Sequence, residues 1–389
     1  MTSEEVISYF ENPRSPLPLN YVAKGTLNSN SIIAAINPRA TEEVIRGVLR
    51  ASKQKNAVVI FELALSEMSI SGGYTGYTPE LFAKRCKNAA EKEKWFAYAL
   101  HADHLTVKKG TDEEMKTVKK EIEARVKAGF TGFAIDTSFL FDRTQPSVKG
   151  QLEQIIKKGL VLFEFLEEQM KGRAYGLEGE VGEIGITEYT TVEEATYYVK
   201  SLKENGVFLD YLAIANGSKH GVNVDAEGNI IPQLGINVKR TVEIVEALKK
   251  EGFNTRIAQH GITGTPIDVI ESTFPHGDVA KGNIGTHWQN VVYSVLEEYE
   301  PELYSEMRTW VLEKYMKEGV DEHKIFASNA KRAWKPFFNK IENLKTDTKE
   351  KIIEKAEEEM LKFIKALKME NTAELCYQHI TSNNLSDTY

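Results

Sequence analysis

The chain has 389 residues, 41% of them hydrophobic, and its 49 lysines and arginines stand against 57 aspartates and glutamates, which gives a net charge of −8. This length excludes a single small domain and suits a large α/β barrel with an appendage. The acidic balance and the lack of a concentrated basic stripe argue against nucleic acid as a partner. The negative net charge does not exclude small anionic substrates, because backbone amides and a metal can bind them locally.

The cysteine content and the apolar runs indicate where the protein works. Its two cysteines, Cys86 and Cys376, are far apart and exclude a disulfide framework or a cysteine-rich zinc site. The first residues are acidic, unlike a signal peptide, and no apolar run approaches the ~20 residues that span a bilayer. We therefore expect a cytoplasmic protein with no membrane partner.

Apolar runs alternate with helical patterns over residues 30–300, which predicts βα units and a parallel sheet. The expected strands cover 32–36, 57–61, 95–100, 132–135, 175–180, 211–216, 256–259 and 279–284. Helix starts are indicated by Thr-Pro at 78–79 and by capping boxes at 111–114 and 191–194. Eight such units predict a (β/α)8 TIM barrel. The alternative, an open doubly wound sheet, would be expected to carry a GxGxxG motif after its first strand, and none is present.

After residue 304 the sequence becomes strongly charged and helix-prone, with no strand pattern. We predict a TIM-barrel catalytic domain at residues 1–300 and a C-terminal helical extension at 301–389. The extension is expected to pack on the barrel or on a partner subunit, and a solvated helix face explains most of its charge.

Two imidazoles and a carboxylate, in the motif 101–104, directly follow the apolar run 95–100. Buried polar groups need hydrogen bonds, ion pairs or a metal, so the plainer alternative is a histidine hydrogen-bonded at a strand end. His104, His220 and His260 all fall at or just beyond expected strand ends, where TIM barrels place their active sites. Three imidazoles with one open position suit a catalytic zinc. His101 lies earlier on its strand and is expected to pack behind the site.

Polar residues end every expected strand: Asn37, Ser66, Asp103 with His104, Asp136, Glu180, His220, His260 and Asn283. Glycines and threonines follow the last two strands, at 261–265 and 283–286. The second of these segments leads into a helix, whose N-terminal amides favour anions. Because TIM barrels often bind phosphate at this place, we predict a phosphate site there.

Five motifs occur in one order: Ala-Asp-His at 102–104, Glu-Gly-Glu-Val-Gly at 178–182, Lys-His-Gly at 219–221, His-Gly-x-Thr-Gly at 260–264 and Lys-Gly-Asn-Ile-Gly-Thr at 281–286. In this combination the chain resembles the class II, metal-dependent fructose-bisphosphate aldolases over residues 30–300, and more loosely to about 340. The resemblance implies reversible cleavage of fructose 1,6-bisphosphate to dihydroxyacetone phosphate and glyceraldehyde 3-phosphate through a zinc-stabilised ene-diolate, in glycolysis and gluconeogenesis. It also implies a homodimer or homotetramer.

The resemblance assigns metal ligands and catalytic groups. His104, His220 and His260 would hold zinc, which similar ligands could replace with cobalt or iron. Asp136 and Glu180 match a second, buried metal site of some family members. The catalytic groups would be three residues: Asp103 as the acid/base at the aldehyde oxygen, Glu188 as the proton carrier at carbon, and Asn283 as support for the ene-diolate.

The resemblance also assigns substrate contacts. The phosphate and a monovalent cation would be bound by Gly221, Gly261, Thr263 and Thr286. The distal half of the substrate would be bound by Asn37 and Ser66, and Arg332 would reach a second phosphate in a neighbouring subunit.

The chain departs from the family pattern at three of these loops. Gly285 stands where the family usually has an aspartate that reads substrate hydroxyls, which leaves the substrate-binding role of this position and the choice of ketose open. Tagatose or sedoheptulose bisphosphate is therefore an alternative substrate. Ile262 replaces a second glycine of the phosphate loop, and Thr187 replaces an acidic residue beside Glu188.

Two other classes of function stay open from sequence. A zinc hydrolase on the same barrel would use the metal to activate water. Such barrels often carry His-x-His on the first strand, where this chain has Ile-Asn-Pro at 36–38. A non-catalytic barrel is opposed by the complete set of Asp103, Glu188 and the three histidines.

Overall fold

The computed structural model describes residues 3–39, 41–182, 189–218, 223–224, 230–231 and 235–385. Within this part of the chain, parallel strands close into a barrel in the order β1-β10-β9-β6-β5-β4-β3-β2. The barrel strands are β1 (Ile33–Ile36), β2 (Val59–Ala64), β3 (Tyr98–Thr106), β4 (Gly132–Asp136), β5 (Gly176–Val181), β6 (Tyr211–Ile214), β9 (Arg256–Gln259) and β10 (Val279–Ile284). A short antiparallel pair, β7 (Asn223–Val224) and β8 (Ile230–Ile231), stands apart from it. The predicted TIM barrel is confirmed.

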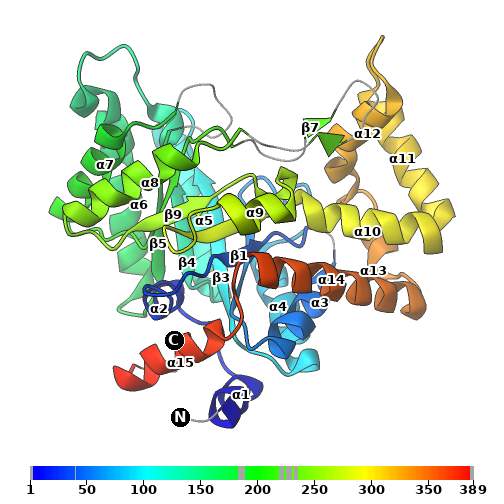
Figure 1. The fold of residues 1–389 in the computed structure, drawn as a ribbon. Coiled ribbons are helices and arrows are strands. Elements are labelled where there is room, and N and C mark those ends of the chain that lie inside the picture. Colours follow the sequence, from blue (N-terminus) through cyan, green and yellow to red (C-terminus); the bar gives the residue numbers. More distant parts are fainter. Residues whose placement is uncertain are drawn as a thin grey trace.

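Helices surround the barrel (Figure 1). They are α1 (Ser3–Glu11), α2 (Leu19–Gly25), α3 (Glu42–Gln54), α4 (Pro79–Glu93), α5 (Asp112–Ala128), α6 (Val148–Met170), α7 (Val192–Glu204), α8 (Val238–Lys250), α9 (Ile267–Thr273), α10 (Thr286–Tyr299), α11 (Pro301–Tyr315), α12 (Glu322–Asn329), α13 (Phe338–Glu342), α14 (Thr346–Ala366) and α15 (Thr372–Ser382), with 3-10 turns η1 (Ser138–Leu140), η2 (Ile262–Gly264) and η3 (Ala330–Ala333). None of the helices in the described ranges is long and apolar enough to cross a membrane.

The predicted capping boxes differ in outcome. At the start of α7, Thr191 accepts from the Glu194 amide while the Glu194 carboxylate accepts from the Thr191 amide, so this box is complete. At the start of α5, Thr111 caps the Glu114 amide as predicted. The Glu114 carboxylate instead accepts from the amides of residues 108–110, so it closes the preceding loop rather than the box.

The C-terminal helices form part of the outer layer of the barrel. Helix α14 packs on α3, and α15 packs on α2 and α1 near the first residues of the chain (Figure 1). The α3–α14 approach is close, since a Cβ built on Gly47 would lie 2.4 Å from the Ile353 carbonyl oxygen. The segment between α14 and α15 also bonds to the barrel, because the Ile32 amide donates to the Leu367 carbonyl over 2.9 Å.

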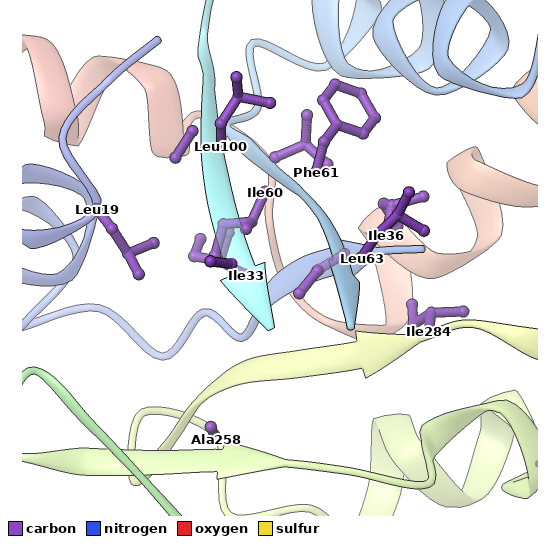
Figure 2. Close-up of a cluster of buried hydrophobic side chains, with 14 of the residues drawn as sticks. Leu19, Ile33, Ile36, Ile60, Phe61, Leu63, Leu100, Ala258 and Ile284 are labelled. Atoms are coloured by element: carbon purple, nitrogen blue, oxygen red, sulfur yellow. The ribbon is translucent and has the colours of Figure 1, made fainter. Parts of the chain in front are cut away.

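The barrel interior changes from apolar to charged along its axis. At the N-terminal end, Leu19 of α2 fills the space beside Gly132 and Gly176, where a Cβ on either glycine would approach it within 2.8 Å. Figure 2 shows Leu19 together with apolar side chains of β1, β2 and β3. The next interior side chains are buried and ionisable: Glu62, His101, Glu178 and Lys281. Two residues further along their strands are Asp103, Glu180 and Asn283, with Asp136 at the end of β4. This alternation brings polar side chains to the C-terminal end of the barrel.

Candidate metal centre and substrate cavity

A cavity of about 720 Å³ opens at the C-terminal ends of the strands. Most of the predicted site residues line it: Asn37, Ser66, Asp103, His104, Asp136, Glu180, His260, Gly261, Thr263, Asn283, Gly285 and Thr286. Arg332 is exposed and does not line this cavity, whereas its neighbour Lys331 does. The predicted residues Glu188, His220 and Gly221 lie outside the described residues.

A bulge in β3 turns two consecutive side chains toward the cavity. The strand is longer than expected, so the motif 101–104 lies within it rather than after it. In a regular strand, Asp103 and His104 would face opposite sides. Here His104 has a φ of 41°, in the left-handed region, and the pairing of β3 with β4 shifts between Ala102 and Leu105. The bulge therefore allows both side chains to line the cavity.

The imidazoles of His104 and His260 converge at one point. His104 Nε2 lies 3.2 Å from His260 Nδ1, and His104 Nε2 lies 3.8 Å from Asp103 Oδ1. Two nitrogens bound to a tetrahedral zinc at 2.0–2.1 Å would be about 3.3 Å apart. These residues therefore fit a zinc ion, and their ligand atoms lie within 4.8 Å of one another.

A second group of possible ligands adjoins the first. His104 Nδ1 lies 2.8 Å from Glu180 Oε2 and 3.5 Å from Asp136 Oδ2. The Asp136 carboxylate also accepts hydrogen bonds from Ser138 and Thr106, which fix its orientation. These positions agree with the predicted second metal site, where Asp136 and Glu180 would be the carboxylate ligands.

The carboxylates around His104 favour a positive charge at this site. Burial opposes the charged form of His104, but Asp103 and Glu180 raise the pKa of this imidazole well above its usual value. Burial raises the pKa of Asp103 to about 6, and the charge of Glu62 adds to this effect. Burial and the neighbouring Asp136 raise the pKa of Glu180 to about 8. A bound metal cation would replace the protons that these groups otherwise retain.

Beneath the metal centre, a buried ion network orients Asn283. Lys281 Nζ lies 2.9 Å from Glu62 Oε2 and 2.8 Å from Glu178 Oε2. The same Glu62 oxygen lies 2.8 Å from His101 Nδ1, so His101 packs behind the site as predicted. The other Glu62 oxygen accepts from Asn283 Nδ2 over 2.7 Å. The side-chain nitrogen of Asn283 therefore donates to Glu62 and Asp103. Its side-chain oxygen is left available to a substrate hydroxyl.

The sequence model of the family described as Fructose-bisphosphate aldolase class-II matches residues 20–374, nearly the whole chain. The chain belongs to this family. No curated protein sequence matched the chain. Membership of this family supports an aldolase activity. The metal dependence typical of class II aldolases agrees with the candidate ligand groups.

Solved structures share the fold of this class II aldolase at low identity. The fructose-bisphosphate aldolase of Campylobacter jejuni has a TM-score of 0.57 and 18% identity, covering 92% of this chain and 97% of the other. The YdjI aldolase of Escherichia coli K12 has a TM-score of 0.55 and 16% identity, covering 90% and 97%. A probable tagatose 6 phosphate kinase from Sinorhizobium meliloti 1021 has a TM-score of 0.61 and 16% identity, covering 91% and 98%.

The loops after β9 and β10, where the sequence predicts a phosphate site, contact each other in this aldolase. Gly261 has a φ of 77°, and Thr263 Oγ1 accepts from the Gly285 amide over 3.2 Å. Ile262 is buried and packs over Gly282, where a Cβ would lie 2.4 Å from Ile262 Cδ1. The isoleucine therefore points into the barrel wall, while the backbone of Gly261 lines the cavity.

Among the charged residues in or beneath the aldolase site, four lie outside the five sequence motifs and were not assigned a role from sequence: Arg39, Glu62, Glu67 and Lys331. The signal for Glu62 was present, because a carboxylate inside an apolar strand needs a partner. The other three come from loops and from the η3 turn, where charged residues are ordinary and no spacing relates them.

Proposed function

We propose that this class II aldolase reversibly cleaves fructose 1,6-bisphosphate into dihydroxyacetone phosphate and glyceraldehyde 3-phosphate. The observation that carries the proposal is the convergence of His104 and His260 beside Asp103 and Asn283 in one cavity. A metal ligand pair, an ionisable carboxyl and a neutral amide are the groups that this carbon–carbon cleavage needs.

We propose zinc as the resident metal, held by His104 and His260 with His220 as the third ligand. Cobalt or iron could occupy the same ligands. The metal would supply Lewis-acid stabilisation of the negative charge that develops when the carbon–carbon bond breaks. Asp136 and Glu180 would hold a second cation, and a monovalent cation could accompany the substrate phosphate.

The protein's own groups would move the protons. Asp103 is buried with a pKa of about 6, so it can take a proton from a substrate hydroxyl and return it near neutral pH. Glu188 is proposed to move the second proton at carbon. Asn283 would hold the substrate oxygens through its carboxamide oxygen, in an orientation that Glu62 fixes.

A second candidate is the same reaction on tagatose or sedoheptulose bisphosphate. One observation favours it. Gly285 has no carboxylate to bind substrate hydroxyls, and the guanidinium of Arg39 lies where a side chain at position 285 would be. Parallel cleavage assays on the three ketose bisphosphates would separate the candidates by their kcat/KM values.

The decisive assay is coupled cleavage of fructose 1,6-bisphosphate with and without EDTA, alongside metal analysis. The proposal expects zinc near one ion per chain and cleavage that EDTA abolishes and zinc restores. Full activity in EDTA, with loss on borohydride treatment in the presence of substrate, would refute the metal mechanism and indicate a lysine Schiff base instead.

We further propose that the enzyme acts in the cytoplasm, in glycolysis and gluconeogenesis, as a homodimer or homotetramer. Cys86 and Cys376 are buried free thiols, which is in keeping with a reducing compartment. Arg332 is exposed and so is available to a neighbouring subunit. Analytical ultracentrifugation of wild type and Arg332→Gln, with activity measured on the same samples, tests the assembly and the role of this arginine.

A further inference from the structure

Arg39 lies on the wall of the substrate cavity in a constrained conformation. It follows β1 by three residues and has a φ of 45°, a left-handed conformation that is unfavourable for a non-glycine residue. Its side chain is 14% exposed and lines the cavity. Strained backbone of this kind is often retained where it aims a functional side chain.

Glu67 fixes the guanidinium on one side. Arg39 Nε donates to Glu67 Oε1 over 2.5 Å. The Glu67 carboxylate also accepts from Tyr74, from Asn37 and from the Ala64 amide. With these donors the carboxylate cannot easily swing away, so it acts as a rigid support for Arg39.

The outer nitrogens of Arg39 point toward the phosphate loops. Nη1 donates to Thr286 Oγ1 over 2.9 Å, at the first residue of α10. Among the residues that the structure describes, Arg39 makes its hydrogen bonds through Nε and Nη1, and none is formed by Nη2. A guanidinium has two donors on this nitrogen, so it offers them to a ligand in the cavity.

Gly285 makes room for this guanidinium. A Cβ built on Gly285 would lie 2.8 Å from Arg39 Nη2 and 3.3 Å from its Cζ. The Gly285 φ is −111°, which any residue adopts, so its backbone does not require glycine. The requirement for a small residue comes from Arg39.

Lys331 adds a second cation to the same wall. Burial and then the charge of Arg39 lower the pKa of Lys331, which indicates that the two cations lie near each other. Both cations line the cavity, where Glu67 pairs directly with Arg39 and Asp103 adds a weaker negative charge.

We propose that the guanidinium of Arg39 binds an oxyanion of the substrate, and that Gly285 is required because it leaves space for this guanidinium. The oxyanion is a phosphate of either the ketone half or the aldehyde half of the substrate. The identity of the substrate rests on the proposed function. The binding of an anion by Arg39 does not depend on it.

Calorimetric titration of the purified protein with inorganic phosphate tests the binding. Arg39→Gln should raise the Kd for phosphate at least about tenfold, since hydrogen bonds to charged groups contribute about 1.5–3 kcal/mol. Gly285→Ala keeps the charge of Arg39 but displaces its guanidinium, so it should raise the Kd for phosphate by a smaller factor. Arg308→Gln, which removes an exposed pair with Glu322, is the matched control and should bind as wild type does.

Two results overturn the proposal: a wild-type protein that binds no phosphate, or variants of Arg39 and Gly285 that bind it as tightly as wild type. Thermal unfolding of each variant shows whether it is folded. If Arg39→Gln does not fold, Gly285→Ala alone decides the question, because it keeps the charge of Arg39 and the Glu67 carboxylate while it displaces the guanidinium.

Aldol condensation identifies the source of the oxyanion. Wild type and Arg39→Gln are compared with dihydroxyacetone phosphate and either glyceraldehyde 3-phosphate or glyceraldehyde. A higher KM for dihydroxyacetone phosphate with both aldehydes assigns Arg39 to the ketone half, and a higher KM for glyceraldehyde 3-phosphate alone assigns it to the aldehyde half. Unchanged KM values contradict the inference. Wild type that condenses neither pair refutes the proposed function, while the phosphate titration still decides the role of Arg39.

Discussion

Replacing Lys281 with methionine is expected to cost about 3–5 kcal/mol of unfolding free energy at pH 8, because it leaves buried carboxylates without their cation. The lysine is fully buried between Glu62 and Glu178, within 2.9 Å of both. Methionine has a similar length and leaves no large cavity, so the loss is electrostatic. For 389 residues the unfolding entropy is about 0.8 kcal/mol/K, and the Tm should fall by about 4–6 °C.

This deficit should shrink as the pH falls. In wild type, burial opposes the charge of Glu178, but Lys281 keeps the pKa of this carboxyl below its usual value. The stability that Glu178 contributes is present above its unfolded pKa of about 4.3 and is lost as the pH falls through the lower folded pKa. In the variant, burial alone acts and the folded pKa rises above the unfolded one. The carboxyl then destabilises the fold at high pH and ceases to do so once protonated.

Differential scanning calorimetry at pH 8 and pH 5.5 checks both expectations with the metal content held equal. Lys340→Met is the matched control, because this lysine pairs with Glu306 at an exposed position and should change the free energy by less than about 1 kcal/mol. The reasoning is refuted if Lys281→Met and Lys340→Met have the same Tm at pH 8. It is also refuted if the deficit is the same at both pH values.

Three further predictions follow from the site and from the helix caps. Zinc added to EDTA-treated protein at pH 7 should release protons, since the surrounding carboxylates hold a proton on metal-free His104; calorimetry in two buffers of different ionisation enthalpy measures the release, and zero release contradicts the assignment. Asp103→Asn should lower kcat about 10²–10⁴-fold while zinc content stays at the wild-type value, and an active variant would remove Asp103 from the mechanism. Thr191→Ala should lower the Tm by about 1 °C through loss of roughly 1 kcal/mol of capping energy, whereas a Tm unchanged within error would show that the box is energetically idle.

The barrel and most of its polar rim could be predicted because both have local sequence signals. Parallel strands covered on both faces read as apolar runs, and each run here ends in a polar residue such as Asn37 or Asp136. Once the strands are ordered around a barrel, those ends must meet, so distant residues such as His104 and His260 are brought together without further information.

Other features depend on contacts that no local pattern encodes. The β3 bulge breaks the alternation on which strand prediction rests, so sequence gave no reason for Asp103 and His104 to share one face. Arg39, in the loop after β1, and Lys331, in η3, lie near each other although they are far apart in the chain, and neither shows a periodic pattern. The helices α1 and α2 were not anticipated, although Leu19 closes the barrel at its N-terminal end.

The bonds between the C-terminal segment and the first strands also bear on the synthesis of the protein. Ser31 Oγ donates to the Lys368 carbonyl, 337 residues away, and the Val58 amide donates to Thr372 Oγ1, 314 residues away. A ribosome adds about 5–20 residues per second, so these partners leave it roughly 15–65 s apart. Throughout that interval the face of α3 that α14 will cover is bare apolar surface on a nascent chain, the kind of surface that chaperones bind. A chain stopped before residue 346 would lack α14, keep that surface bare permanently and become a substrate for aggregation or proteolysis.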